Sequence, residues 1–169
     1  MKKFIGVFLA IILIISQSTL VFADKNGANL NLKCKSAVLM DVTSGKVLYE
    51  KNCHEKLPPA SVTKVMTMLL ICEAVESNKI KLTDEVTVSE TASSMGGSQI
   101  FLEPNETQTV DTLLKGIAVA SANDACVAMA EYISGNEEEF VRQMNERAKG
   151  LGMNDTNFED CCGLTDSPT

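Results

Sequence analysis

The chain has 169 residues, of which 45% are hydrophobic, and its 22 acidic residues outnumber 15 basic ones to give a net charge of −7. An acidic chain without a cluster of lysine and arginine is a poor candidate for binding nucleic acid. The length is sufficient for one domain with its own hydrophobic core. We therefore expect a single folded domain and no nucleic-acid partner.

The first 23 residues have the pattern of a secretory signal peptide. Lys2 and Lys3 make a positive start, an apolar stretch covers residues 4–15, and residues 21–23 suit cleavage. Without this segment the balance is 13 basic against 22 acidic residues, a net charge of −9. No later stretch reaches the roughly 18 uninterrupted apolar residues of a membrane helix. We predict a signal peptide at 1–23, and a mature chain that is secreted, in the cell wall or on the outer face of the cytoplasmic membrane.

Residues 36–50 alternate in the manner of two short strands around a turn. A turn that pairs Asp41 with Lys46 places Cys34 opposite Cys53. Because disulfides form in exported proteins, a Cys34–Cys53 disulfide is one interpretation. Two free thiols at the strand ends are the other.

Helical patterns follow in four segments, 61–76, 110–120, 124–134 and 137–149, with a short strand predicted at 84–89. Segment 61–76 is apolar on every side, which predicts a buried helix. Pro58 and Pro59 prevent the helix from extending upstream and place Ser61 at or near its start. Thr109 is the expected N-cap of the second helix, and Gly135 ends the third.

Ser61 and Lys64 are three residues apart, so they share one face of a helix. Serine is a weak nucleophile and needs a base to take its proton. A lysine is a base only in its neutral form, which apolar surroundings favour. The spacing also occurs by chance, and its apolar context is what favours catalysis, since a charge there is expensive without a purpose or partner.

Ser121-Ala122-Asn123 falls at a break between two predicted helices, where a hydroxyl and an amide can project into a cleft. Ser134-Gly135-Asn136 has the same spacing. Its structural explanation is complete, because Gly135 ends one helix and Asn136 caps the next. We therefore select the first of the two as the functional motif.

Other candidates have simpler explanations. His54, the only histidine, lies in a polar connection and is expected to face solvent. The carboxylates of residues 137–139 suit a helix N-terminus. Cys161-Cys162 is a candidate redox or metal pair, but a single histidine and no matching Cys-x-x-Cys argue against zinc. Cys72 and Cys126 lie in apolar helical patterns, where buried free thiols are expected.

Three stretches together resemble the low-molecular-mass penicillin-binding proteins, which are serine-type D-alanyl-D-alanine carboxypeptidases. They read "LPPASVTKVMTMLLICEAVE", "GGSQIFLEPNETQTVDTLLKGIAVASANDACVAMAEYISG" and "LGMNDTNFEDCCGLTDSP". The resemblance runs from about residue 36 to the last residue and includes the Ser-x-x-Lys and Ser-x-Asn motifs of the family. It implies an α+β fold like that of serine β-lactamases, with part of an antiparallel sheet packed against a mainly helical region.

The resemblance also implies a role for each motif residue. Ser61 would be the acyl-ester nucleophile, Lys64 its proton acceptor and Ser121 a proton relay, while Asn123 would bind substrate. The substrate would be peptidoglycan stem peptides ending in D-Ala-D-Ala, and β-lactam antibiotics would inhibit. No cofactor or metal is implied.

The family's third motif, Lys-Thr-Gly, does not occur in this sequence. We therefore expect residues 24–169 to be the N-terminal part of the catalytic domain, with an incomplete sheet. Peripheral membrane association through a C-terminal region outside this sequence stays open. Two rival hypotheses remain: a β-lactamase of the same fold, and a truncated, non-catalytic peptidoglycan-binding product.

Overall fold

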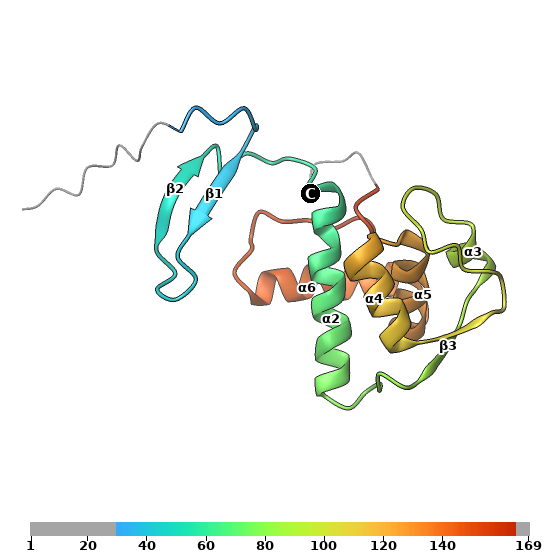
Figure 1. Cartoon of the computed structure of the whole chain (residues 1–169). Coiled ribbons are helices and arrows are strands. Elements are labelled where there is room, and N and C mark those ends of the chain that lie inside the picture. Colours follow the sequence, from blue (N-terminus) through green and yellow to red (C-terminus); the bar gives the residue numbers. More distant parts are fainter. Residues whose placement is uncertain (1–29, 165–169) are drawn as a thin grey trace, which may run out of the picture. The chain divides into compact units, whose positions relative to one another are not determined.

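A computed structural model describes residues 30–164, and the predicted signal peptide at 1–23 lies outside them. The chain divides into two compact units, residues 1–55 and 56–169. The described part of the first unit is a hairpin, and that of the second is mainly helical (Figure 1). The chain contains both antiparallel strands and helices, as the predicted α+β class requires. The packing of the hairpin on the helices stays a prediction.

The hairpin of the first unit consists of β1 (Ala37–Met40) and β2 (Val47–Lys51). Its turn is closed by two backbone hydrogen bonds, from the Asp41 N–H to the Lys46 carbonyl and from the Gly45 N–H to the Asp41 carbonyl, both 2.9 Å. Ser44 donates through its hydroxyl and its backbone N–H to the Asp41 carboxylate, which lowers the pKa of that carboxyl. The predicted pairing of Asp41 with Lys46 is confirmed.

The disulfide between Cys34 and Cys53 is absent from the described hairpin, where both are free thiols. A bulge is the physical reason. Met40 pairs with Val47, but Leu39 pairs with Tyr49, so one residue of β2 has no paired residue on β1. This extra residue shifts the remaining pairs by one position, and the continued register no longer places Cys34 opposite Cys53.

The described part of the second unit contains a 3₁₀ turn, η1 (Ala60–Thr63), and five helices: α2 (Lys64–Glu76), α3 (Glu90–Ser93), α4 (Val110–Ala120), α5 (Asn123–Ser134) and α6 (Glu137–Gly150). Two strands, β3 (Glu85–Thr87) and β4 (Thr107–Thr109), pair antiparallel. The four long helices lie where they were predicted. The sequence reasoning missed α3 and β4, which are only four and three residues long.

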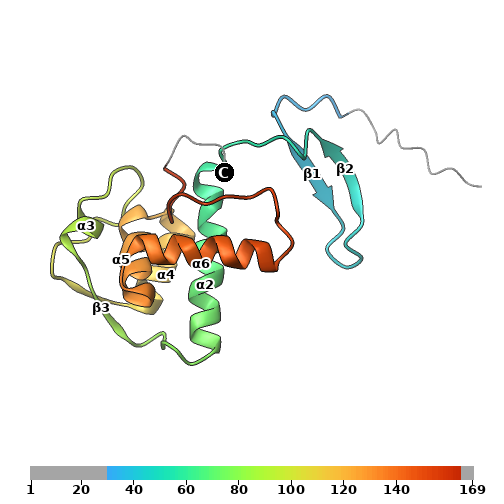
Figure 2. The ribbon, with the colours of Figure 1, turned by 180° about the vertical axis from the view of Figure 1, so that it is seen from behind.

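Helix α2 packs against α4, α5 and α6, and Figure 2 shows α6 lying across it. The fully buried side chains of this core come from most elements of the unit: Ile71, Val86, Val88, Val110, Leu113, Met129, Phe140 and Met144. On α4 and α6 these residues are three or four positions apart, as expected for helices with one apolar face.

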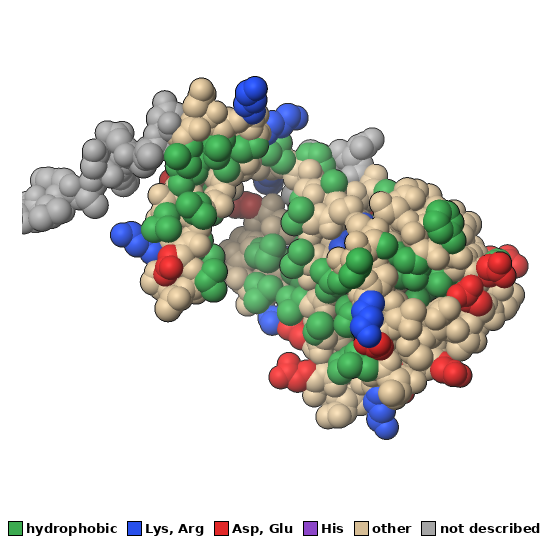
Figure 3. Space-filling model, in the orientation of Figure 1, with side chains coloured by type: hydrophobic (Ala, Val, Ile, Leu, Met, Phe, Trp, Pro, Cys, Tyr) green, Lys and Arg blue, Asp and Glu red, His purple; other side chains and the backbone are tan. Residues whose placement is uncertain are grey.

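The prediction that α2 is buried on every side is wrong for the described residues. One side of α2 is buried, with Met66, Thr67, Ile71 and Ala74. On the other side Val65 is 61% exposed, and Cys72 is also exposed. The uncovered side of α2 lines an apolar hollow of about 370 Å³ with residues 151–158 of the same unit. Figure 3 shows hydrophobic side chains gathered over this helix.

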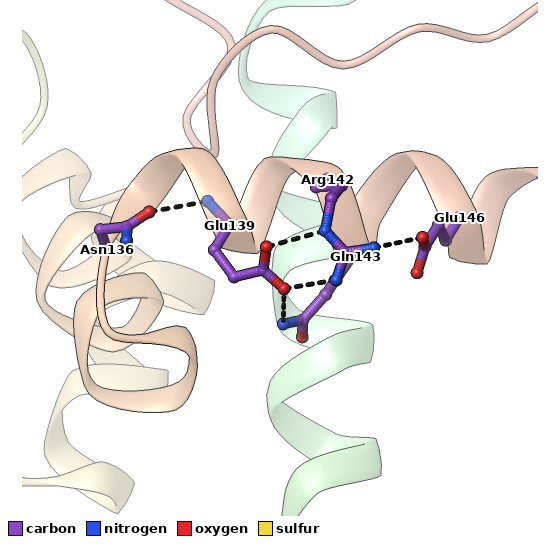
Figure 4. Close-up of polar contacts among 5 residues, drawn as sticks. All are labelled: Asn136, Glu139, Arg142, Gln143 and Glu146. Atoms are coloured by element: carbon purple, nitrogen blue, oxygen red, sulfur yellow. Dashed lines mark hydrogen bonds and ion pairs between the residues drawn. The ribbon is translucent and has the colours of Figure 1, made fainter.

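The predicted helix ends are confirmed at three positions. The Thr109 side chain accepts from the Thr112 N–H at the start of α4. Gly135 ends α5 with φ of +85°, and the Asn136 side chain accepts from the Glu139 N–H at 2.8 Å to begin α6 (Figure 4). Ser134-Gly135-Asn136 is therefore a helix-to-helix connection, as predicted.

The acidic start of α6 is also structural. Glu139 forms hydrogen-bonded ion pairs with Arg142 and accepts from Gln143, and Arg142 reaches Glu146 on the next turn (Figure 4). The hydrogen bonds from Arg142 and Gln143 lower the pKa of Glu139 to about 2. Among residues 30–164, no helix has the length and apolar character needed to cross a membrane.

We predict that Asn136→Ala destabilises the protein by about 1 kcal/mol, because it removes the side-chain acceptor of an N-terminal N–H of α6. Denaturant unfolding monitored by circular dichroism measures this loss. Asn136→Asp, which keeps the acceptor, is the matched control. An alanine variant as stable as the parent would contradict the capping role.

Candidate active site

Ser61 stands on the 3₁₀ turn η1, one turn ahead of the α-helix that Lys64 begins. Pro59 precedes the turn, and Ala60 takes a positive φ of +48°, so the chain bends sharply just before the serine. The Lys64 N–H bonds to the carbonyls of Ser61 and Val62 and joins the turn to α2. This arrangement leaves Ser61 exposed at the end of a helix whose inner face is buried.

The Lys64 side chain is only 3% exposed. Its Nζ lies 3.2 Å from Ser61 Oγ and donates to the backbone carbonyl of Cys162 at 2.8 Å. Burying an amine costs free energy unless its N–H groups find acceptors. Lys64 therefore meets the predicted geometry: it is within proton-transfer distance of the serine hydroxyl and withdrawn from water.

Residues 160–163 form the wall opposite the start of α2. The Thr67 hydroxyl donates to the Cys161 carbonyl at 2.6 Å, one turn beyond the bond from Lys64 to Cys162. The Asp160 carboxylate accepts from the N–H groups of Cys162, Gly163 and Leu164, which folds this segment back on itself.

Gly163 is the point of closest approach between this segment and the serine turn. It has φ of +80°, and a Cβ there would lie 2.0 Å from the Ala60 carbonyl oxygen and 2.7 Å from Thr63 Oγ1. Only glycine tolerates both the backbone conformation and the contact. Sequence reasoning missed residues 160–163 as part of the site, because their contacts with α2 span more than ninety positions along the chain.

The second predicted motif lies at the corner between α4 and α5. Ser121 ends α4 in the left-handed conformation with φ of +57°, and Asn123 is the first residue of α5. Asn123 is buried, its N–H bonds to the Ser98 carbonyl at 2.8 Å, and its Nδ2 donates to the Gly96 carbonyl at 2.7 Å.

Cys162 joins the two motifs. Its carbonyl accepts from Lys64, and its thiol lies 3.6 Å from the Asn123 carbonyl oxygen. Within the described residues, the side chains of Ser121 and Asn123 make no hydrogen bond with Ser61 or Lys64. The structure thus brings Ser61 and Lys64 into direct contact and attaches Asn123 to them through Cys162.

Unpaired buried oxygens gather at this place. Four buried side-chain atoms in the described part of the chain lack a hydrogen-bond partner, and three of them are Thr63 Oγ1, Ser121 Oγ and Asn123 Oδ1. Buried polar atoms are nearly always paired, so such a group calls for an explanation. Thr63, Ser121 and Asn123 thus each hold a buried oxygen without a protein partner among the described residues.

Three buried thiols lie beside the lysine. Cys161 Sγ is 3.6 Å from Cys162 Sγ, and hydrogen bonds from the Cys126 and Cys161 thiols hold the pKa of Cys162 below its ordinary value. The same hydrogen bonds, followed by burial, raise the pKa of Cys126 and Cys161. No group of three histidine, cysteine or acidic residues between 30 and 164 is arranged to hold a metal ion.

Comparisons with known proteins identify the family. The sequence profile of D-alanyl-D-alanine carboxypeptidases, peptidase family S11, matches residues 23–169. The chain is 54% identical over 169 residues to D-alanyl-D-alanine carboxypeptidase DacF of Bacillus subtilis, an alignment that includes 98% of this chain and 43% of DacF. The chain belongs to the D-alanyl-D-alanine carboxypeptidase family.

Solved structures of this family have the same fold. The D-alanyl-D-alanine carboxypeptidase DacD of Francisella tularensis superposes with a TM-score of 0.81 at 35% identity, over 83% of this chain and 34% of DacD. Penicillin binding protein 5 of Haemophilus influenzae gives 0.76 at 41% identity, over 79% of this chain and 40% of that protein. The described structure is therefore part of the α+β fold of penicillin-binding proteins, and the chain spans less than half the length of these relatives.

We predict that Gly163→Ala disrupts the site, because the new Cβ would collide with the backbone of Ala60, the residue before Ser61. The matched control is Gly152→Ala, where φ is +79° but no atom lies within 4 Å of the new Cβ. Both variants carry the backbone strain of alanine at positive φ, of order 1 kcal/mol, and only the first adds the collision. Thermal unfolding and covalent labelling by a fluorescent penicillin compare them, and equal behaviour of the two variants would contradict the collision argument.

Proposed function

We propose that the full-length protein is an exported serine-type D-Ala-D-Ala carboxypeptidase that removes the terminal D-alanine from peptidoglycan stem peptides. Family membership supports the reaction class. The observation that carries the assignment to particular residues is the 3.2 Å contact between Ser61 Oγ and the buried Lys64 Nζ.

Acylation would begin when Lys64 accepts the Ser61 hydroxyl proton. Ser61 Oγ then bonds to the carbonyl carbon between the two D-alanines, and the bond from that carbon to the leaving nitrogen breaks. Ser121 would relay the proton to the leaving D-alanine, which departs as the free amino acid. Its buried, unpaired hydroxyl supports such a relay because no protein partner competes for it.

Asn123 would bind the substrate, for which its unpaired Oδ1 is available. Water then attacks the acyl-serine ester and releases the shortened stem peptide. A β-lactam has the same kind of amide carbonyl, so penicillin would acylate Ser61 and be released slowly. Slow release separates this proposal from a β-lactamase, which must hydrolyse its ester quickly.

The amino-terminal pattern supports export, with residues 1–23 as the signal peptide and action on the outer side of the cytoplasmic membrane. We propose residues 24–169 as the N-terminal part of the catalytic domain, since the relatives are more than twice as long as the stretch they share with this chain.

We predict that Ser61→Ala in the full-length protein abolishes the covalent penicillin adduct seen by intact-mass spectrometry. Lys64→Ala should slow acylation by roughly 10²–10⁴-fold, the usual contribution of a positioned general base. The control is Ser134→Ala, which changes the serine of the Ser-x-Asn triplet that connects α5 and α6. This variant should be acylated at the same rate as the parent. D-alanine release from a stem-peptide analogue is measured alongside.

Three results would reject the proposal in different ways. An adduct that persists in Ser61→Ala would place the nucleophile elsewhere. Rapid hydrolysis of a chromogenic cephalosporin would identify a β-lactamase. Binding to peptidoglycan with neither an adduct nor D-alanine release would identify a non-catalytic wall-binding protein.

A further inference from the structure

Residues 96–102, called the strap here, are held by two consecutive residues at the start of α5. The Asn123 side chain donates to the Gly96 carbonyl and its backbone N–H donates to the Ser98 carbonyl. The Asp124 carboxylate then accepts from the N–H groups of Ile100 and Leu102 at 3.2 and 3.1 Å. Every second residue of the strap is therefore bound to Asn123 or Asp124.

Asp124 is fully buried, and it takes part in none of the ion pairs of the described residues. Its oxygens instead accept from three backbone N–H groups, those of Ile100, Leu102 and its own neighbour Ala125. An ionised carboxylate only accepts hydrogen bonds and has lone pairs enough for three such donors. The carboxylate thus satisfies loop N–H groups that have no secondary-structure partner.

The backbone of the strap shows the effect of this double contact. Ile100 packs its side chain against Gly116 of α4, and Leu102 is buried. Between them, Phe101 takes a left-handed φ of +59° and leaves its ring 81% exposed. A bulky residue at positive φ is a genuine outlier that the surrounding structure must hold in place. Asp124 supplies the two hydrogen bonds on either side of it.

The strap in turn determines how the Asn123 amide is oriented. Its Nδ2 is engaged by the Gly96 carbonyl, and a Cβ on Gly97 would lie 2.7 Å from that nitrogen, so the strap presses closely on the amide. The Asn123 Oδ1 has no partner. The hydrogen bond to Gly96 thus fixes which way the amide faces and leaves its buried oxygen without a protein partner among the described residues.

We propose that Asp124 is a positioning residue for acylation: by holding the strap against α5 it fixes the Asn123 amide with its oxygen free to receive the substrate. The inference rests on the proposed function and adds a residue to it. Asp124 itself touches no substrate, and its effect passes through Gly96 and Asn123.

The decisive experiment is a double-mutant cycle on the rate of acylation by benzylpenicillin, with the full-length protein. Asp124→Asn keeps the shape but puts an amide N–H₂ where one backbone donor needs an acceptor. Because small misplacements of a site can slow a reaction by about 10²-fold, we expect Asp124→Asn to acylate roughly 10–100-fold more slowly. In an Asn123→Ala background the same change should have an effect below about 3-fold, because coupled residues are not additive.

The control is Asp111→Asn, which makes the same replacement in the first turn of α4, where Asp111 pairs with Lys115 on the surface. It should acylate like the parent. If Asp124→Asn slows acylation equally in both backgrounds, or not at all, the inference is wrong. If the parent protein itself is not acylated, the proposed function fails first and the positioning role fails with it.

A second measurement needs no variant and covers the case in which Asp124→Asn does not fold. Amide hydrogen exchange of the parent protein should show Ile100 and Leu102 protected, with Phe101 exchanging at least about tenfold faster, since its N–H lacks the carboxylate. Equal exchange at residues 100, 101 and 102 would mean that Asp124 does not hold the strap, and would overturn the inference.

Discussion

The buried amine of Lys64 imposes the main constraint on this structure. A side chain that carries N–H donors into the interior must find acceptors there, or the protein loses several kcal/mol. Lys64 finds one on the preceding 3₁₀ turn, at Ser61 Oγ, and another at the Cys162 carbonyl, 98 residues further along the chain. Residues 160–163 must therefore return to the start of α2.

The return of residues 160–163 to α2 explains the other contacts of this segment. The Thr67 hydroxyl, one helical turn from Lys64, donates to the preceding carbonyl, that of Cys161, so two side chains of α2 hold two successive peptide groups. Gly163 is then forced against the serine turn, where a Cβ has no room. Cys162 is in contact with the start of α5 through its thiol, which brings the Ser121-Ala122-Asn123 corner to the same place. Contacts that begin at one buried lysine thus connect Ser61, the corner and the returning segment.

Local chemistry made the helices and their ends predictable from sequence. Thr109, Gly135 and Asn136 act on groups within four positions of themselves, and each has the predicted role. The Ser61–Lys64 contact is also local, and the structure confirms it. What could not be predicted depends on distant partners: the bulge in β2 that separates Cys34 from Cys53, the exposed side of α2, and the return of residues 160–163. Neither the hydrophobic periodicity nor any turn residue in the sequence encodes these three features.

The two Ser-x-Asn triplets show how position decides what an asparagine can do. Asn136 is an N-cap with extended backbone, so its side-chain oxygen is used on the Glu139 N–H of its own helix. Asn123 comes one position later relative to its helix: Ala122 is the N-cap and Asn123 is already the first helical residue. From there the side chain makes no cap bond, its nitrogen bonds to the strap, and its oxygen stays unpaired. A one-residue shift against the helix boundary thus separates an asparagine that caps its own helix from one whose side chain holds a distant loop.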